Sequence, residues 1–136
     1  MYELFEHTAD LGLRVRAADL ETLFAEAGRG LFSMVVDDLD QVTPRETRTI
    51  ELPAGALDYL LFDWLNELLY LCDTQRLVCC EFEVQLGDQG LKAVIRGEPL
   101  DPARHRLTHE VKAITYHQLK LEHHPDGWLA EVIVDI

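Results

Sequence analysis

The sequence predicts a single α+β domain, residues 1–136, in which two helices pack on a mixed β-sheet. Three observations predict this class. Two segments in the first half carry apolar residues at helical spacing, and the second half alternates apolar and polar residues as strands do. The length of 136 residues fits one domain of ordinary size. Helices early in the chain and strands late in it are typical of α+β domains, and the expected order is roughly β-α-β-α-β-β-β-β.

The chain is expected to open with a strand and a helix. Leu11, Leu13 and Val15 alternate with polar residues, which is the pattern of a half-buried strand. Asp19 is a suitable N-cap for the helix that follows. Apolar residues then recur on one face as far as Val35, so we expect this helix to bury one side.

A short strand over residues 47–52 leads to the second helix, expected over 57–71. The apolar residues of this second segment cover more than one helical stripe. A helix with this pattern is covered by other parts of the protein on most sides. We therefore expect it to lie deep in the domain.

The second half predicts four strands in two hairpins. Segments 78–86 and 91–95 alternate on either side of a glycine-rich turn. Segments 111–121 and 128–136 follow after an irregular, proline-containing stretch. Asp126-Gly127 is a strong signal for a tight hairpin turn between these last two strands.

The charge balance is strongly acidic. The net charge is −13, from 25 acidic and 12 basic residues. Phosphates repel a surface of this sign, so we expect no direct nucleic-acid binding. A basic protein partner or metal cations suit it better, although solubility alone also explains such a surface.

No segment is expected to enter or cross a membrane. The longest apolar run, 56–72, contains Asp58, Asp63 and Glu67, which are costly in hydrocarbon. The first ten residues lack the basic and apolar regions of a secretory signal. The cysteines have no C-x-x-C spacing, so we expect reduced thiols in a cytoplasmic protein; they are Cys72, Cys79 and Cys80.

Two aspartates at the ends of strand patterns are the clearest candidates for a shared site. Asp10 follows His7 by three residues, and Asp135 directly precedes Ile136, whose terminal carboxylate is a second acidic group. If the first and last strands are neighbours, three carboxylates meet. At about 4 Å and an effective dielectric near 20, each like-charged pair costs about 4 kcal/mol, so the cluster must take up a proton or a cation. A polar loop and a frayed chain end are the alternatives left open.

Other candidates are weaker. In the 111–121 pattern, Lys112 shares a face with Ile114 and Tyr116, whereas Val111 lies on the other face. Lys112 is then an ion-pair partner, an anion binder or a plain surface lysine. The six histidines form no zinc-type motif, and Ser33 is the only serine, in a helical pattern. We therefore expect no catalytic residues.

The chain resembles the archease family over nearly its whole length. Each block alone is weak, but together and in the family's order they are specific. The segments that carry the resemblance are EHTADLGLRV at 6–15, DLETLFAEAGRGLF at 19–32, LLFDWLNELLYL at 60–71, EVKAITYHQL at 110–119 and WLAEVIVDI at 128–136.

The resemblance implies a fold, a site and a role. The fold is α+β with a mixed sheet and two helices, and the metal site comprises Asp10, Asp135 and Ile136. Archeases activate a GTP-dependent tRNA-splicing RNA ligase, which joins 3′-phosphate or 2′,3′-cyclic phosphate ends to 5′-hydroxyls. They promote guanylylation of the ligase's histidine and its multiple turnover, and they are not themselves enzymes.

The residues add two expectations to this resemblance. Oxygen ligands favour calcium, with magnesium or manganese as alternatives, and calcium's 6–8 oxygens require water or a partner to complete the shell. His7 is expected to orient the metal ligands without binding the metal itself. The competing hypothesis is a small metal-dependent hydrolase in which His7, Asp10 and Asp135 act on a bound water.

Overall fold

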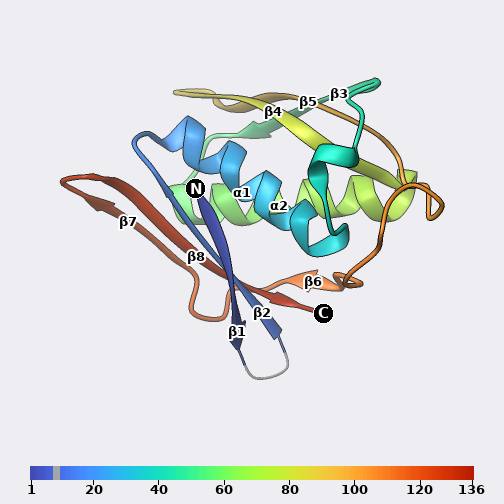
Figure 1. Cartoon of the computed structure of the whole chain (residues 1–136). Coiled ribbons are helices and arrows are strands. Elements are labelled where there is room, and N and C mark those ends of the chain that lie inside the picture. Colours follow the sequence, from blue (N-terminus) through green and yellow to red (C-terminus); the bar gives the residue numbers. More distant parts are fainter. Residues whose placement is uncertain (8–9) are drawn as a thin grey trace.

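Two helices lie between two β-sheets in the computed structural model, which describes residues 1–7 and 10–136 apart from the side chain of His7 (Figure 1). Helices α1 (Leu20–Val35) and α2 (Leu57–Gln75) form the middle layer. The remaining elements are β1 (Tyr2–His7), β2 (Asp10–Ala17), the short 3-10 helix η1 (Leu39–Gln41), β3 (Glu46–Pro53), β4 (Leu77–Gly87), β5 (Gly90–Pro99), β6 (Ala113–Ile114), β7 (Lys120–His124) and β8 (Gly127–Asp135).

The α+β class and the two helices are confirmed, but the expected single mixed sheet is wrong. The described residues form one sheet in the order β1-β2-β8-β6, with β7 also pairing to β8, and a second in the order β3-β5-β4. Every described pairing is antiparallel. Helix α1 links strands of different sheets, and α2 links two strands that β5 keeps apart. No described neighbours therefore run parallel.

The core draws on both helices and both sheets. Trp64 of α2 is fully buried, and its indole Nε1 donates a hydrogen bond to the carbonyl of Phe24 in α1 at 2.8 Å. This bond satisfies the one polar atom that Trp64 brings into the core. At the start of α1, the carboxylate of Asp19 accepts from the amide of Thr22 at 2.8 Å, so the expected N-cap is confirmed.

The cysteines are free thiols. Cys79 and Cys80 are buried and Cys72 is half-buried. Burial raises the pKa of Cys79 to about 12 and that of Cys72 to about 11. Both groups are therefore protonated and poor nucleophiles at neutral pH.

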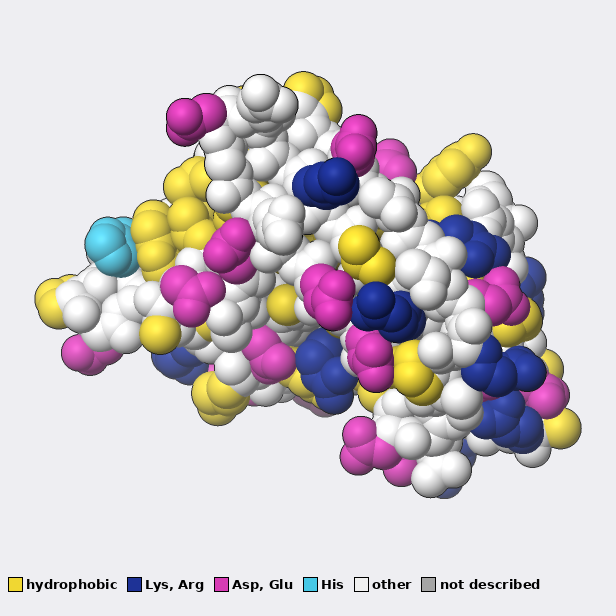
Figure 2. Space-filling model, turned by 90° about the horizontal axis from the view of Figure 1, so that it is seen from above, with side chains coloured by type: hydrophobic (Ala, Val, Ile, Leu, Met, Phe, Trp, Pro, Cys, Tyr) yellow, Lys and Arg dark blue, Asp and Glu magenta, His cyan; other side chains and the backbone are white. Residues whose placement is uncertain are grey.

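The outer face of the β3-β5-β4 sheet is charged with both signs. Figure 2 shows acidic and basic side chains interspersed over this face. Arg96 of β5, for example, lies 3.3 Å from Glu83 of β4.

Within the described part of the chain, no helix is long and apolar enough to span a membrane.

The strand expected over 111–121 is broken. The chain pairs with β8 only at β6 and again at β7, and Gln118 between them has a left-handed backbone with φ 56°. Val111 and Ile114 are both buried, so the expected alternation of faces is also wrong here. The amide and hydroxyl of Thr115 both donate to the carbonyl of Ile133, after which the chain turns away from β8.

Candidate functional site

Asp10 and Asp135 occupy opposite positions on neighbouring strands. Asp10 begins β2, Asp135 ends β8, and the two are partners in the antiparallel register. Directly opposite residues of such a pair project from the same face with Cβ atoms about 4.5–5.5 Å apart. The structure therefore brings together the two carboxylates that the sequence singled out.

The same row extends across two more strands. His7 of β1 is the register partner of Asp10, and Ala113 of β6 is the partner of Asp135. The side chain of His7, and with it the orienting role expected for it, lies outside the described residues. Figure 1 shows the end of the chain beside β6 and near the β1–β2 end of this sheet.

The β2–β8 register is fixed by packing. Val132 and Val134 of β8 are fully buried, and Leu13, the partner of Val132, is fully buried as well. A slip of one residue would turn these side chains out of the core. The buried strands therefore fix which residues stand opposite each other at the site.

Lys112 and Ile136 lie on either side of Asp135. The amide of Lys112 donates a 2.8 Å hydrogen bond to the carbonyl of Asp135, whereas the Lys112 side chain is exposed. Ile136 is half-buried and packs against the core. The backbone that presents Asp135 is thus held from both directions.

The two aspartates have no counter-charge among the described residues. Neither forms an ion pair there, and the two arginines of β2, Arg14 and Arg16, lie four and six residues further along the strand, where they pair with Glu131 and Glu3, each at 3.0 Å. Two adjacent, half-exposed carboxylates without such a partner favour a cation between them.

The donor set fits a hard cation in part. Aspartate oxygens are ligands that calcium and magnesium prefer. No group of three or more His, Cys, Asp or Glu side chains within residues 1–7 and 10–136 could hold a metal. A metal at Asp10 and Asp135 therefore needs oxygens from elsewhere, such as a main-chain carboxylate, water or a partner.

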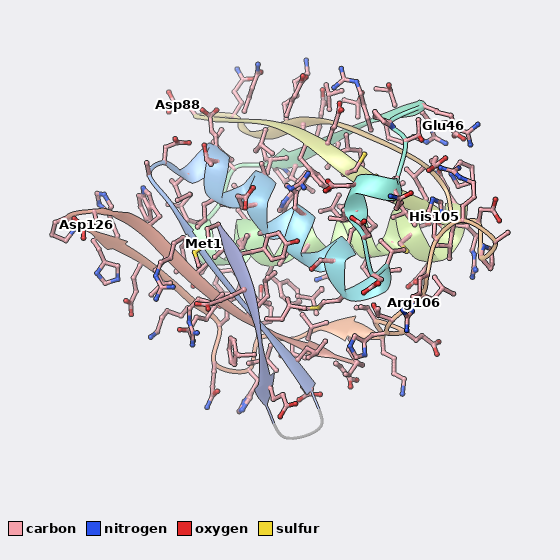
Figure 3. All side chains as sticks on the ribbon, viewed as in Figure 1. Met1, Glu46, Asp88, His105, Arg106 and Asp126 are labelled. Atoms are coloured by element: carbon pink, nitrogen blue, oxygen red, sulfur yellow. The ribbon has the colours of Figure 1, made fainter. Side chains whose placement is uncertain are left out.

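A second carboxylate site was not predicted from the sequence patterns. Glu98 of β5 is fully buried, and its oxygens accept from both terminal nitrogens of Arg104 at 2.7 and 3.0 Å and from the amide of Thr43 at 2.7 Å. His105 Nε2 lies 2.9 Å from the carboxylate, while the ring's Nδ1 accepts from the amide of Asp101. Figure 3 shows His105 at the side of the molecule where η1 and β3 lie.

These partners stabilise the charged form of Glu98. Hydrogen bonds from Arg104 lower the pKa of Glu98 to about 2, against the opposing effect of burial. Strand alternation predicts that Glu98 points outward with Lys92 and Arg96, so pattern alone misses its burial. The available signal was a glutamate followed six and seven residues later by an arginine and a histidine.

A family model matches the sequence over nearly the whole chain. The model described as "Archease protein family (MTH1598/TM1083)" matches residues 2–136. "Protein archease" of Methanopyrus kandleri is 42% identical over 139 residues, which cover 99% of each chain. "Protein archease" of Pyrococcus abyssi is 41% identical over 140 residues, which cover 99% of this chain and 98% of the relative.

Two solved structures have the same fold. The solution structure of Methanobacterium thermoautotrophicum protein 1598 superposes with a TM-score of 0.86 at 32% identity, covering 99% of this chain and 98% of the other. A Thermotoga maritima crystal structure titled as an archease, possible chaperone, gives a TM-score of 0.66 at 23% identity, covering 100% and 98%. The second likeness concerns the fold alone.

Proposed function

The chain belongs to the archease family, and we propose that it activates a GTP-dependent tRNA-splicing RNA ligase through a metal held by Asp10, Asp135 and Ile136. The ligase is the partner that the family resemblance implies. The activation consists of promoting guanylylation of the ligase's histidine and repeated turnover. In this proposal the chain itself catalyses no reaction, binds no RNA directly and acts in the cytoplasm.

The observation that carries the proposal is the register pairing of Asp10 with Asp135. Two carboxylates at this spacing, neither of them paired with a lysine or arginine among the described residues, favour a divalent ion. Calcium is the favoured ion and magnesium or manganese the alternatives, because all proposed ligands are oxygens. Such an ion supplies positive charge and open coordination positions at the surface of the protein.

Three residues have proposed supporting roles. Ile136 supplies a main-chain carboxylate as the third ligand, His7 orients the ligands, and the exposed side chain of Lys112 contacts the partner. Too few ligands come from this chain to fill a calcium shell of 6–8 oxygens. The remaining positions are therefore open to water or to oxygens of the ligase complex.

The direct test is multiple-turnover RNA ligation by the matching ligase. Wild type, Asp10→Ala and Asp135→Ala are compared with Asp126→Ala, a control that removes an exposed carboxylate from the β7–β8 turn. Wild type and the control should stimulate turnover, and both site variants should not. Stimulation that survives both site mutations removes the metal site from the proposal.

Two further outcomes separate the competing hypotheses. No stimulation by wild type overturns the activator role. Metal-dependent hydrolysis of an RNA phosphate end by wild type alone, lost in Asp10→Ala, favours the hydrolase. One glycine added after Ile136 tests the third ligand, because it moves the carboxylate by about 3.8 Å and should weaken both metal binding and activation.

A further inference from the structure

Exposed apolar side chains gather beside the first half of α2. Of seven large hydrophobic residues exposed in the described part of the chain, Leu57, Tyr59 and Tyr116 lie here. The ring of Tyr116 stacks on Phe62 with centroids 3.8 Å apart, and it lies 5.2 Å from the ring of Tyr59. We call these four residues the aromatic patch.

The loop after β6 builds this patch. It carries Tyr116 onto α2, and the amide of Leu119 donates to the carbonyl of Tyr116 at 3.1 Å to close the turn. A groove of about 730 Å³ continues beyond Leu57 between α2 and β7. Tyr59 is 56% exposed and Tyr116 44% exposed, so burial in the core does not explain this stack. Exposed tyrosine rings in contact with other aromatic rings are typical of protein interfaces.

The charge around the patch restricts its occupant. Partial burial raises the pKa of Tyr116, and the nearby carboxylates of Asp63 and Asp58 raise it further. Acids at this position repel RNA phosphates. With a net charge of −13, a second copy of this chain is also repelled. A basic protein surface is attracted.

Arginine is the side chain that matches both features. A guanidinium stacks on an aromatic face and donates paired hydrogen bonds to a carboxylate. The patch offers aromatic faces with Asp58 and Asp63 beside them. Interfaces are enriched in such tyrosine and arginine anchors, which carry a large share of the binding energy.

We propose that the aromatic patch is a docking surface for a basic face of a partner protein that presents an arginine to Tyr59 and Tyr116. The inference rests on the proposed function in taking the RNA ligase as that partner. Tyr116 follows Ala113 by three residues, roughly 10 Å of chain, and Ala113 pairs with Asp135. A partner bound at the patch therefore also reaches the carboxylates.

Titration experiments can separate partner binding by the aromatic patch from stimulation by the carboxylates. Tyr59→Ala and Tyr116→Ala are titrated into multiple-turnover ligation, with Tyr70→Ala as the matched control. Tyr70 lies on the same helix, is 61% exposed and is outside the patch. The patch variants should need about tenfold or more protein for half-maximal stimulation, as expected for loss of an interface anchor, with the maximal rate unchanged.

A second set of variants leaves the ring stack intact. Asp58→Lys and Asp63→Lys reverse the charge beside the patch and should raise the half-maximal concentration in the same direction. Asp10→Ala should instead mainly lower the maximal rate, and in a direct binding titration with the ligase it should lose less affinity than the patch variants lose.

The outcomes separate the two proposals. Patch and charge-reversal variants that match Tyr70→Ala in both titrations overturn the docking surface and leave the activator role standing. Wild-type protein that neither binds nor stimulates the ligase overturns both.

Discussion

The buried Glu98 and the surface pair Asp10 and Asp135 have contrasting surroundings. Glu98 is fully buried and surrounded by donors from its own chain: Arg104, His105 and the amide of Thr43. Asp10 and Asp135 are half-exposed and opposite each other, with no ion-pair partner among the described residues. A carboxylate whose charge is balanced internally serves the fold, whereas a pair left unbalanced at the surface is suited to a ligand from outside.

Removal of the buried carboxylate should have the largest effect on stability. Glu98→Ala leaves Arg104, His105 and the amide of Thr43 without their acceptor. Breaking a buried ion pair costs about 3 kcal/mol. Urea unfolding measures this loss in the free energy of unfolding. Glu83→Ala, on the exposed face of β4, is the control and should stay within about 0.5 kcal/mol of wild type. Equal effects of the two variants would show that the buried Glu98 contributes no more to stability than an exposed glutamate.

The contribution of Glu98 should depend on pH. Its pKa is lowered from 4.5 to about 2 in the folded protein. A carboxyl with a lowered folded pKa stabilises the fold fully above its unfolded pKa. This contribution is therefore lost as pH falls from about 4.5 towards 2. The free energy of unfolding of wild type and of Glu98→Gln is measured at pH 7, 4 and 3. The difference between the two proteins should become smaller as the pH falls. A constant difference contradicts it.

The surface pair should behave in the opposite sense. Without divalent metal, Asp10→Asn removes a like charge directly opposite Asp135 and should stabilise the protein by about 0.2–1 kcal/mol. Chelator-treated wild type and variant are compared by urea unfolding. Destabilisation by this variant indicates that Asp10 already has an internal partner.

Lys112→Ala should have the smallest effect. Only the amide of Lys112 contacts Asp135, and its side chain is exposed. The free energy of unfolding should change by less than about 0.5 kcal/mol. A larger loss, measured in the same way, places the lysine side chain in the carboxylate site.

Local patterns predicted much of this fold. Helix α1 begins and ends where the Asp19 cap and the apolar stripe indicate, and the hairpin turn before β8 is confirmed. Helix α2 continues past the expected end at residue 71 to Gln75, because no glycine or proline interrupts it before Arg76. The separate strand β1 was not expected, since its apolar and charged residues gave no clear alternation.

Long-range contacts account for what the sequence did not reveal. The loop that carries Arg104 and His105 folds over Glu98 and reverses the face that alternation predicts. Pairing of the strands that carry the two aspartates was a hypothesis from the sequence, and the register of β2 with β8 confirms it. Metal binding stays a prediction, because it depends on atoms beyond the chain.

Calcium titration of the purified protein tests the central claim most directly. Wild type should bind calcium and gain stability, by about 2.7 kcal/mol at a concentration 100 times the Kd. Asp10→Asn and Asp135→Asn should lose both effects. Glu131→Gln, a β8 carboxylate already paired with Arg14, should retain them. Calcium binding that is unchanged in both aspartate variants would contradict the account. So would a wild-type protein that binds none of the three ions calcium, magnesium and manganese.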